Sequence, residues 1–149
     1  MGYFCTSPTR NLLYETVLIP TAVYEELLDE RAGEDVITAV QSTIWLKIQV
    51  VQNQELVSEL RNLINLGEAE AIALAIEVNA ARLLIDERLG RQAAADRRLR
   101  ITGIFGVLLT AKRQGLITAI KPVMDDLVAK ANFRVSSQLY AEVLMTANE

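Results

Sequence analysis

The sequence predicts an α/β protein with a mostly parallel sheet and helices on both of its faces. Short apolar runs rich in β-branched residues alternate along the chain with segments of helical periodicity. Of the 149 residues, 51% are hydrophobic, so the chain is long and apolar enough to form a domain with its own core. Only 3 prolines and no repeats or low-complexity tracts interrupt it, so we expect a single domain over residues 1–149.

The first half of the chain contains three predicted strands. Residues 3–5 form a short apolar segment, and residues 17–19 form a second one that ends at Pro20. Pro20 suits the first turn of a helix, which we expect to continue to about residue 28. Residues 45–51 alternate between apolar and polar side chains and predict a strand, and a helix follows over residues 54–64.

A capping signal predicts the next helix. Asn65 is a good N-cap residue, and Glu68, three residues later, is its capping-box partner. We expect this helix to reach about Val78, with Ala69, Ile72, Ala73 and Ile76 on one face. The remaining predicted elements are a buried strand over 82–85, a helix over 88–99, a strand over 100–102, and helices over 103–115, 122–131 and 137–147.

Composition excludes several classes of function. The single Cys excludes an internal disulfide framework and favours a reducing cytoplasm. The absence of His excludes His-based catalytic triads and His-ligated zinc. No apolar run approaches the roughly 20 residues of a membrane span, and the first residues lack the pattern of a signal peptide. We therefore expect a cytoplasmic protein without a membrane partner, whose acid–base or metal chemistry uses carboxylates, Lys, Tyr, Ser/Thr or water.

Two short segments carry candidate carboxylates. Glu68 and Glu70 lie in the first turns of the helix after Asn65, but residues two apart on a helix do not face the same way. Since Glu68 has a capping role, Glu70 is the better ligand; the alternative for both is an acid that stabilises the helix start. Asp86 directly follows a buried strand, where ligands bind in parallel sheets, and the alternative is a cap for the helix near Arg88.

Carboxylates gathered at one edge of a sheet would bind Mg²⁺ or Mn²⁺, which prefer oxygen ligands. Such an ion can activate water to hydrolyse a phosphodiester. Residues 82–134 carry 11 basic and 5 acidic side chains, whereas residues 1–81 carry 4 and 12. Within the basic part, Arg88 and Arg91 lie one turn apart and would contact a phosphate backbone or orient the carboxylates. The alternative is a set of solvated helix faces.

Smaller groups near the start and the middle of the chain have weaker signals. Thr6 and Ser7 would orient a ligand, or would merely form a turn with Pro8. Cys5 is expected to be a small buried residue, since no His exists to activate it. The glycines at 103 and 106 lack the spacing and the Lys of a phosphate loop, and are expected to permit close helix–sheet contact.

Five segments taken together resemble the PIN-domain superfamily, and more closely the prokaryotic PIN-like proteins often encoded as toxin–antitoxin components. They are residues 17–27, 66–75, 83–91, 102–109 and 111–117. The resemblance covers nearly the whole chain from Val17 onward. It implies a three-layer α/β/α sandwich around a mostly parallel sheet, and an Mg²⁺- or Mn²⁺-dependent endoribonuclease. It places the acidic family positions at Glu26, at Glu70 or Glu68, and at Asp86.

The sequence departs from the family at its start. The family opens with a strand that ends in Asp-Thr-Ser-Pro, and the matching residues here are Cys5, Thr6, Ser7 and Pro8. Cys5 thus stands where the family has a metal-binding Asp, and a thiolate suits Mg²⁺ poorly. The first strand and helix also look shortened, either by nature or through a gene-model error. This departure predicts a weakened or inactive member.

Two functions follow as hypotheses. The first is a PIN-like, metal-dependent ribonuclease, the toxin of a toxin–antitoxin pair, with Glu26, Glu70 and Asp86 as catalytic metal ligands and Glu68 as a further one. In this reading Thr6, Ser7, Arg88 and Arg91 contact the RNA. The second is an inactive module that binds RNA, an antitoxin-like protein or a second copy of itself. A homodimer would cover apolar surface on Leu12, Leu13 and Tyr14.

Overall fold

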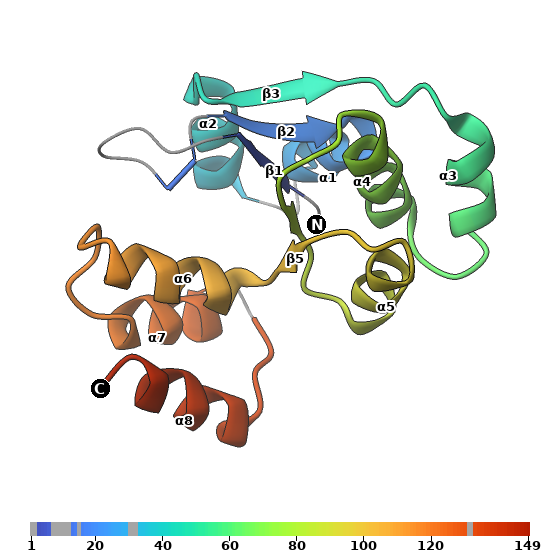
Figure 1. The fold of residues 1–149 in the computed structure, drawn as a ribbon. Helices are drawn as coiled ribbons and strands as arrows, with labels where there is room; N and C mark the ends of the chain where they lie inside the picture. Colours follow the sequence, from blue (N-terminus) through green and yellow to red (C-terminus); the bar gives the residue numbers. More distant parts are fainter. Residues whose placement is uncertain (1–2, 7–12, 15, 30–32, 131–132) are drawn as a thin grey trace. The chain divides into compact units, whose positions relative to one another are not determined.

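Four of the five strands in the sheet run in the same direction. The computed structural model describes residues 3–6, 13–14, 16–29, 33–130 and 133–149 (Figure 1). Its sheet has the order β3-β2-β1-β4-β5, with parallel pairing between β2 and β3 and between β4 and β5. The middle strand, β1, is antiparallel to both of its neighbours, so β2 and β4 also run the same way. The strands are β1 (Tyr3–Thr6), β2 (Thr16–Pro20), β3 (Leu46–Gln49), β4 (Leu83–Leu84) and β5 (Ile101–Thr102).

This topology confirms a mixed α/β fold with a mostly parallel sheet. The antiparallel β1 departs from the prediction, in which every strand alternates with a helix. β1 ends at Thr6 and β2 begins at Thr16, so nine residues join the two strands, and Thr6 lies opposite Thr16 in their register. Two strands joined by a short connection pair antiparallel, because a parallel pair needs a longer crossover. The three-layer arrangement stays a prediction.

The carboxyl ends of β2, β4 and β5 meet at one edge of the sheet, because these three strands share a direction. The segments that follow them are therefore neighbours at this edge: the start of α1 after Pro20, Asp86 after β4, and Gly103 after β5. In parallel sheets this is the edge at which ligands bind. The fold thus brings residues that are far apart in sequence to the edge at which the sequence predicts a site.

The helices agree with the prediction to within a few residues at their ends, apart from one helix that the sequence does not signal. Helix α2 has no buried residue, and its Val, Ile and Thr side chains favour helices less than unbranched ones do. Among the described residues, no helix combines the length and apolar content that a membrane span needs. The helices are α1 (Thr21–Leu28), α2 (Glu34–Ser42), α3 (Gln54–Leu60), α4 (Leu66–Glu77), α5 (Arg88–Asp96), α6 (Ile104–Arg113), α7 (Lys121–Lys130) and α8 (Ser137–Thr146).

Helix α4 is the centre of the largest core. The Asn65 side chain accepts a hydrogen bond from the backbone N–H of Glu68 at 2.8 Å, which confirms the predicted cap. From Gly67 to Ala75 nearly every residue is buried, because α4 packs against α1, α3, α5 and the sheet. Burial therefore extends beyond the predicted face, of which Ala69, Ile72 and Ala73 are buried and Ile76 is 41% exposed.

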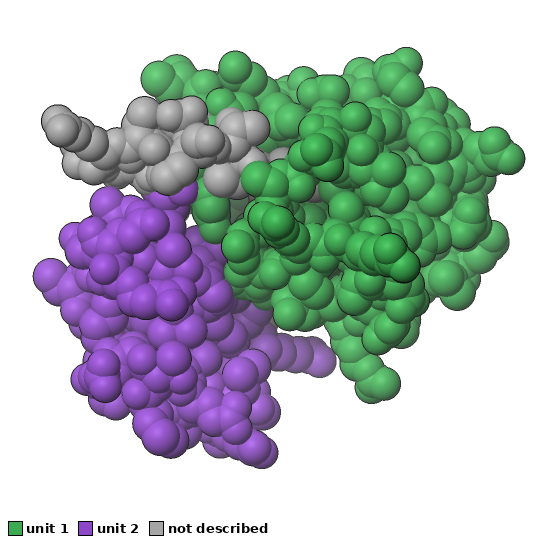
Figure 2. Space-filling view, in the orientation of Figure 1, with its two compact units in different colours: residues 1–10, 14–103 green, residues 11–13, 104–149 purple. Residues whose placement is uncertain are grey.

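The chain divides into two compact units, and the expected single domain over residues 1–149 stays a prediction (Figure 2). Residues 1–10 and 14–103 form the first unit, which contains the sheet. Residues 11–13 and 104–149 form the second, called the C-terminal unit below. Its helices α6, α7 and α8 contribute to a separate core, whose fully buried members are Ile120 and Met124.

The last residue of the chain holds the C-terminal unit together. Oε1 of Glu149 accepts hydrogen bonds from Lys112 Nζ at 2.6 Å and from the N–H of Ile120 at 2.7 Å. Its Oε2 accepts one from the N–H of Lys121, at the start of α7, at 3.0 Å. These donors, Lys112 first, lower the pKa of the Glu149 carboxyl to about 2. Glu149 therefore links the end of α8 to α6 and α7.

Candidate active site

Asp86 lies at the carboxyl edge of the sheet, one residue beyond the buried Ile85. Its side chain is exposed, and its Oδ1 lies 2.7 Å from the position that a Cβ would take at Gly103. Gly103 therefore permits a close approach, as predicted, but to a carboxylate rather than between a helix and the sheet. Asp86 is not the cap of the helix that begins at Arg88, because the N-cap of α5 is Glu87.

Arg91 brings positive charge to the same place. It extends from the first turn of α5, half-buried, and its Nη1 donates a hydrogen bond to the backbone carbonyl of Ile85 at 3.0 Å. The same Nη1 lies 3.2 Å from the Cβ position at Gly103, beside the carboxylate of Asp86. Arg91 thus ties α5 to the end of β4 and faces the candidate site. Arg88, the first residue of α5, is exposed.

Glu70 lies beside the start of α1. Its Oε2 accepts a hydrogen bond from the backbone N–H of Ala22 at 2.9 Å. Helix α1 has no acidic residue in its first turn, and its N-cap, Pro20, contributes no side-chain hydrogen bond. A carboxylate from another helix therefore satisfies a backbone donor that the helix itself leaves open. Glu70 is consequently held at the carboxyl end of β2.

Glu26 lies one turn further along α1 and is exposed. Its Oε1 lies 2.8 Å from the position of a Cβ at Gly67, in the first turn of α4. The absence of a side chain at Gly67 therefore lets the Glu26 carboxylate lie against the α4 backbone. Glu25, its neighbour, is also exposed.

Glu68 is a buried carboxylate. It is 1% exposed, and its Oε1 has no hydrogen-bond partner among the described residues. That oxygen lies against Gly90 of α5, where a Cβ would overlap with it. Burial, followed by the charges of Glu87 and Glu26, raises the pKa of the Glu68 carboxyl, and the backbone of Asn65 acts in the opposite direction. The side chain predicted to serve mainly as a capping partner thus lies in the interior.

The four predicted metal ligands therefore occupy different surroundings. Within the part of the chain that the structure describes, no three Asp, Glu or Cys side chains are grouped to hold one ion. The side chains of Cys5 and Thr6, and all of Ser7, lie outside the described residues. The donor chemistry fits a hard cation, and Mg²⁺ is usually bound by one or two carboxylates together with water. The assignment of site residues stays a prediction.

Three glycines form part of this region, and only one of them drew attention in the sequence. Each lies beside a carboxylate that a larger residue would displace. For Gly67 and Gly90 the available signal was a glycine in the first turn of a helix, a position where Gly costs helix stability and needs a packing reason. The three pairs are Gly67 with Glu26, Gly90 with Glu68, and Gly103 with Asp86.

Comparison with known proteins gives one match. A family model described as a PIN domain matches residues 9–149. No curated protein and no solved structure matches the chain.

Proposed function

The chain belongs to the PIN-domain family, and from this premise we propose that it is a ribonuclease dependent on Mg²⁺ or Mn²⁺, with Asp86 and Glu70 as the principal ion ligands. The family has a nuclease-type fold and its members are generally metal-dependent. The present chain supplies carboxylates and arginines but no His, which agrees with a hard divalent cation rather than zinc.

One observation carries the proposal. Glu70 is held by the N–H of Ala22 at the carboxyl end of β2, and Asp86 follows β4, which runs in the same direction. Two carboxylates from distant parts of the sequence are therefore positioned along the edge at which parallel sheets bind ligands. Glu26 and Glu68 approach the first turns of α4 and α5, and we propose them as further ligands.

Each group has a role in this proposal. Asp86 and Glu70 would provide the oxygen ligands, and the bound ion would activate water and neutralise charge on the phosphate. Arg91, held by the carbonyl of Ile85, orients Asp86 and counters its charge. The exposed Arg88 would hold the RNA backbone with its planar guanidinium, together with Thr6 and Ser7.

Asp86→Asn tests the proposal directly. This change keeps the shape of an exposed side chain but removes the charge, so we expect metal-dependent cleavage of a fluorescent single-stranded RNA to fall about 100-fold or more. Asp96→Asn is the matched control, because Asp96 lies at the far end of α5 and bonds only to Gln92 among the described residues. Equal cleavage by wild type and Asp86→Asn, or cleavage that persists with chelator, would overturn the proposal.

Cys5→Asp tests the departure at the start of the chain. If Cys5 occupies the position of the family's Asp, restoring that carboxylate adds a hard ligand, and we expect cleavage to rise with Mg²⁺ more than with Mn²⁺. Cys5→Ser serves as the control, since it removes the thiol without adding charge. If Cys5→Asp cleaves RNA no faster than Cys5→Ser, residue 5 does not belong to the metal site.

A toxin role with an antitoxin partner belongs to the same proposal. Expression of the wild-type chain in a bacterial host should arrest growth through RNA cleavage, and expression of Asp86→Asn should not. Arrest by both proteins would show that any toxicity is independent of the carboxylate site.

A second candidate function, assembly with another copy of the chain, is favoured by strand β3. β3 lies at the end of the sheet, and Ile44 and Val50 beside it are 92% and 62% exposed. Trp45 and Ile48 are partly exposed as well. An edge strand with exposed apolar side chains can pair with its own copy about a two-fold axis. Of the dimer surface predicted earlier, Leu13 and Tyr14 are half-buried and Leu12 lies outside the described residues.

Light scattering coupled to size exclusion tests this candidate. If β3 mediates a homodimer, Ile48→Lys should yield monomers, because it places like charges across the shared edge. Leu63→Lys, at an exposed apolar position away from β3, should leave the dimer intact. A wild-type monomer at high micromolar concentration would remove this candidate.

A further inference from the structure

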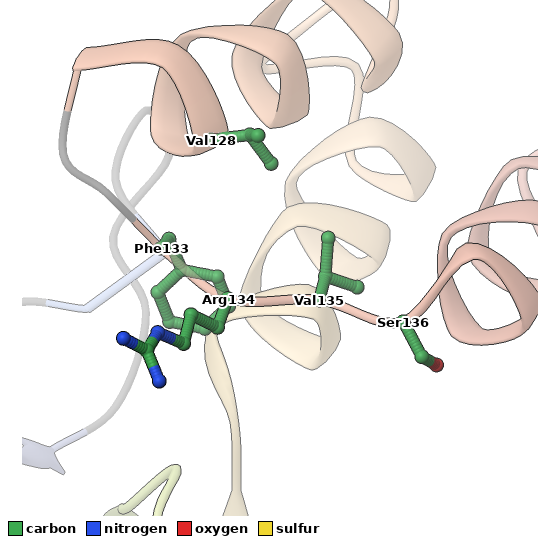
Figure 3. Close-up of a pocket in the computed structure, with 5 residues that line it drawn as sticks. All are labelled: Val128, Phe133, Arg134, Val135 and Ser136. Carbon is green, nitrogen blue, oxygen red and sulfur yellow. The ribbon is translucent and has the colours of Figure 1, made fainter.

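We propose that the C-terminal unit carries a second contact site for single-stranded RNA, in which Arg134 holds a phosphate and Phe133 supports a base. The site is the cavity beside the segment that joins α7 to α8 (Figure 3). The identity of the ligand as RNA rests on the proposed function. The evidence for a site comes from the cavity, its charge and its aromatic wall.

The cavity has the size of a small-ligand site. Its volume is about 850 Å³, within the range of roughly 300–1,000 Å³ that ligand pockets occupy. Val128 lines it from α7, and Phe133, Arg134, Val135 and Ser136 line it from the segment that leads into α8. In Figure 3 the Arg134 side chain points away from Val128, so the cavity has an apolar end and a charged end.

Arg134 is the basic residue of this unit that the fold leaves available. It is exposed and makes no hydrogen bond or ion pair with the described residues. The other four basic residues of 104–149 have partners: Lys112 with Glu149, Lys121 with Asp125, Lys130 with Asp126, and Arg113 with the hydroxyl of Thr110. A guanidinium without an internal partner fits a phosphate, which it can bind through two parallel hydrogen bonds.

The start of α8 adds positive potential next to Arg134. Ser136 caps the helix, with its Oγ accepting a hydrogen bond from the N–H of Leu139 at 3.2 Å. The first turn of α8 contains no acidic residue, so the partial positive charge of the helix start is not neutralised there. This feature supports phosphate binding by Arg134 but does not by itself define the site.

Phe133 provides a surface for a base. Its ring packs edge-to-face against Phe105 of α6, with centroids 5.5 Å apart and an interplanar angle of 83°. This contact holds the ring in place, while Phe133 stays partly exposed and Val128 extends the apolar wall. A fixed aromatic ring next to a cation fits the stacked base and phosphate of a nucleotide. It fits an acidic peptide less well, because a carboxylate side chain has no aromatic ring to stack on Phe133.

Fluorescence polarisation with the full-length protein and a labelled decauridylate tests the proposal. The measurement is made in EDTA, so that no metal-dependent cleavage takes place. We expect Arg134→Gln to weaken binding about 5-fold to 10-fold and to lower the slope of log K against log salt by about 0.7, the value for one phosphate contact in a single strand. Arg113→Gln, an exposed Arg of the same unit outside the cavity, should change the affinity less than about 2-fold.

A second variant tests the aromatic wall. Phe133→Leu keeps an apolar side chain but removes the stacking face, so we expect about a 3-fold to 10-fold loss of affinity with an unchanged salt slope. Circular dichroism melting of each variant shows that the fold is intact. An unchanged affinity and salt slope for Arg134→Gln would overturn the site. Arg134-dependent binding of a labelled Glu-Leu decapeptide, without Arg134-dependent binding of RNA, would replace RNA with an acidic peptide.

The two proposals can fail separately. Binding is measured in EDTA and cleavage with metal, and Asp86 does not line this cavity, so each assay reports on one proposal. If Arg134 contributes to binding but no cleavage occurs with metal, the ribonuclease proposal fails and the contact site stands. If cleavage occurs and Arg134→Gln has no effect on binding, the contact site alone fails.

Discussion

The carboxylates of the two units differ in their hydrogen-bond and ion-pair partners. In the C-terminal unit, Asp125, Asp126 and Glu149 each pair with a lysine of the same unit. Two of these pairs lie within α7, and the third links α6 to Glu149, which follows α8. In the first unit, Glu68 is buried, and its Oε1 has no hydrogen-bond partner among the described residues. The buried Glu68 leaves negative charge where a cation or a proton would be favourable.

The pKa values express this difference. Lys112 and two backbone N–H groups lower the pKa of Glu149 to about 2, whereas burial raises the pKa of Glu68. The same residue type therefore becomes a stronger acid in one unit and a weaker acid in the other. The cause is the balance between donors and burial, since three donors outweigh burial at Glu149, whereas burial outweighs the backbone hydrogen bond of Asn65 at Glu68.

The largest stability effect is expected at the contact between Gly90 and Glu68. Gly90→Ala would place a Cβ against Glu68 Oε1 and 2.6 Å from Ile85 Cδ1, so we expect the free energy of unfolding to fall by about 1–3 kcal/mol. Urea denaturation measures it, with the exposed Ala95→Ser in the same helix as the control. Gly→Ala inside a helix ordinarily stabilises by up to about 1 kcal/mol, so a gain would contradict the described packing.

The next effect concerns the charge on Glu68. Glu68→Gln removes a buried charge, so we expect the free energy of unfolding at pH 7 to rise by about 1 kcal/mol. The folded-state pKa of Glu68 is raised, so its contribution to stability is present below its ordinary value of 4.5 and is lost as pH rises through the folded-state pKa. The gain from the substitution should therefore disappear near pH 4.

Thermal melting over pH 4–8 without metal checks this expectation, and the exposed Glu25→Gln in α1 is the control. A loss of stability at pH 7 would indicate that the charged Glu68 has a partner in solution. Adding Mn²⁺ extends the test to the proposed ion site, since it should raise the melting temperature of wild type more than that of Glu68→Gln.

A smaller effect of the opposite sign is expected at Glu149. Glu149→Gln weakens the link to Lys112 and to the start of α7, so the C-terminal unit should melt at a lower temperature. The pKa of Glu149 is lowered to about 2, so its contribution is present above about pH 4.5 and is lost as pH falls towards 2. The difference in melting temperature between Glu149→Gln and wild type should therefore decrease as the pH falls from about 4.5 towards 2. Glu142→Gln, whose partner is Gln138, should show no such pH dependence.

The smallest effect is expected at the exposed pair of Asp126 and Lys130. Their side chains lie one helical turn apart and are 62% and 74% exposed. We expect Asp126→Asn to change the free energy of unfolding by less than about 0.5 kcal/mol in urea denaturation. A larger loss of unfolding free energy would mean that this exposed ion pair contributes substantially to the stability of the C-terminal unit.

Local signals account for most of what could be predicted. The cap at Asn65, the apolar segment that ends at Ile85 and the break near Gly115 each depend on neighbouring residues, and each was found from the sequence. Helix α2 was not predicted because it has no buried face to create periodicity. The direction of β1 was not predicted because strand pairing depends on residues distant in the chain.

The candidate site also combines features that local sequence predicts with contacts between distant residues. The sequence identified Asp86 and Glu70 as candidate ligands, since each lies next to a recognisable strand end or helix start. It could not show that Glu70 bonds to Ala22, 48 residues away, or that Glu68 lies against Gly90. These contacts arise only when α1, α4 and α5 pack together.

By itself, the sequence determined the alternation of strands and helices, the helix caps and the exclusion of His-based chemistry, because these follow from local periodicity and residue type. Only the tertiary structure decided which carboxylates are paired, which is buried and which follow strands at the shared edge. The physical reason is that burial and hydrogen-bond partners come from elements remote in the chain, and these set the charge that each carboxylate carries.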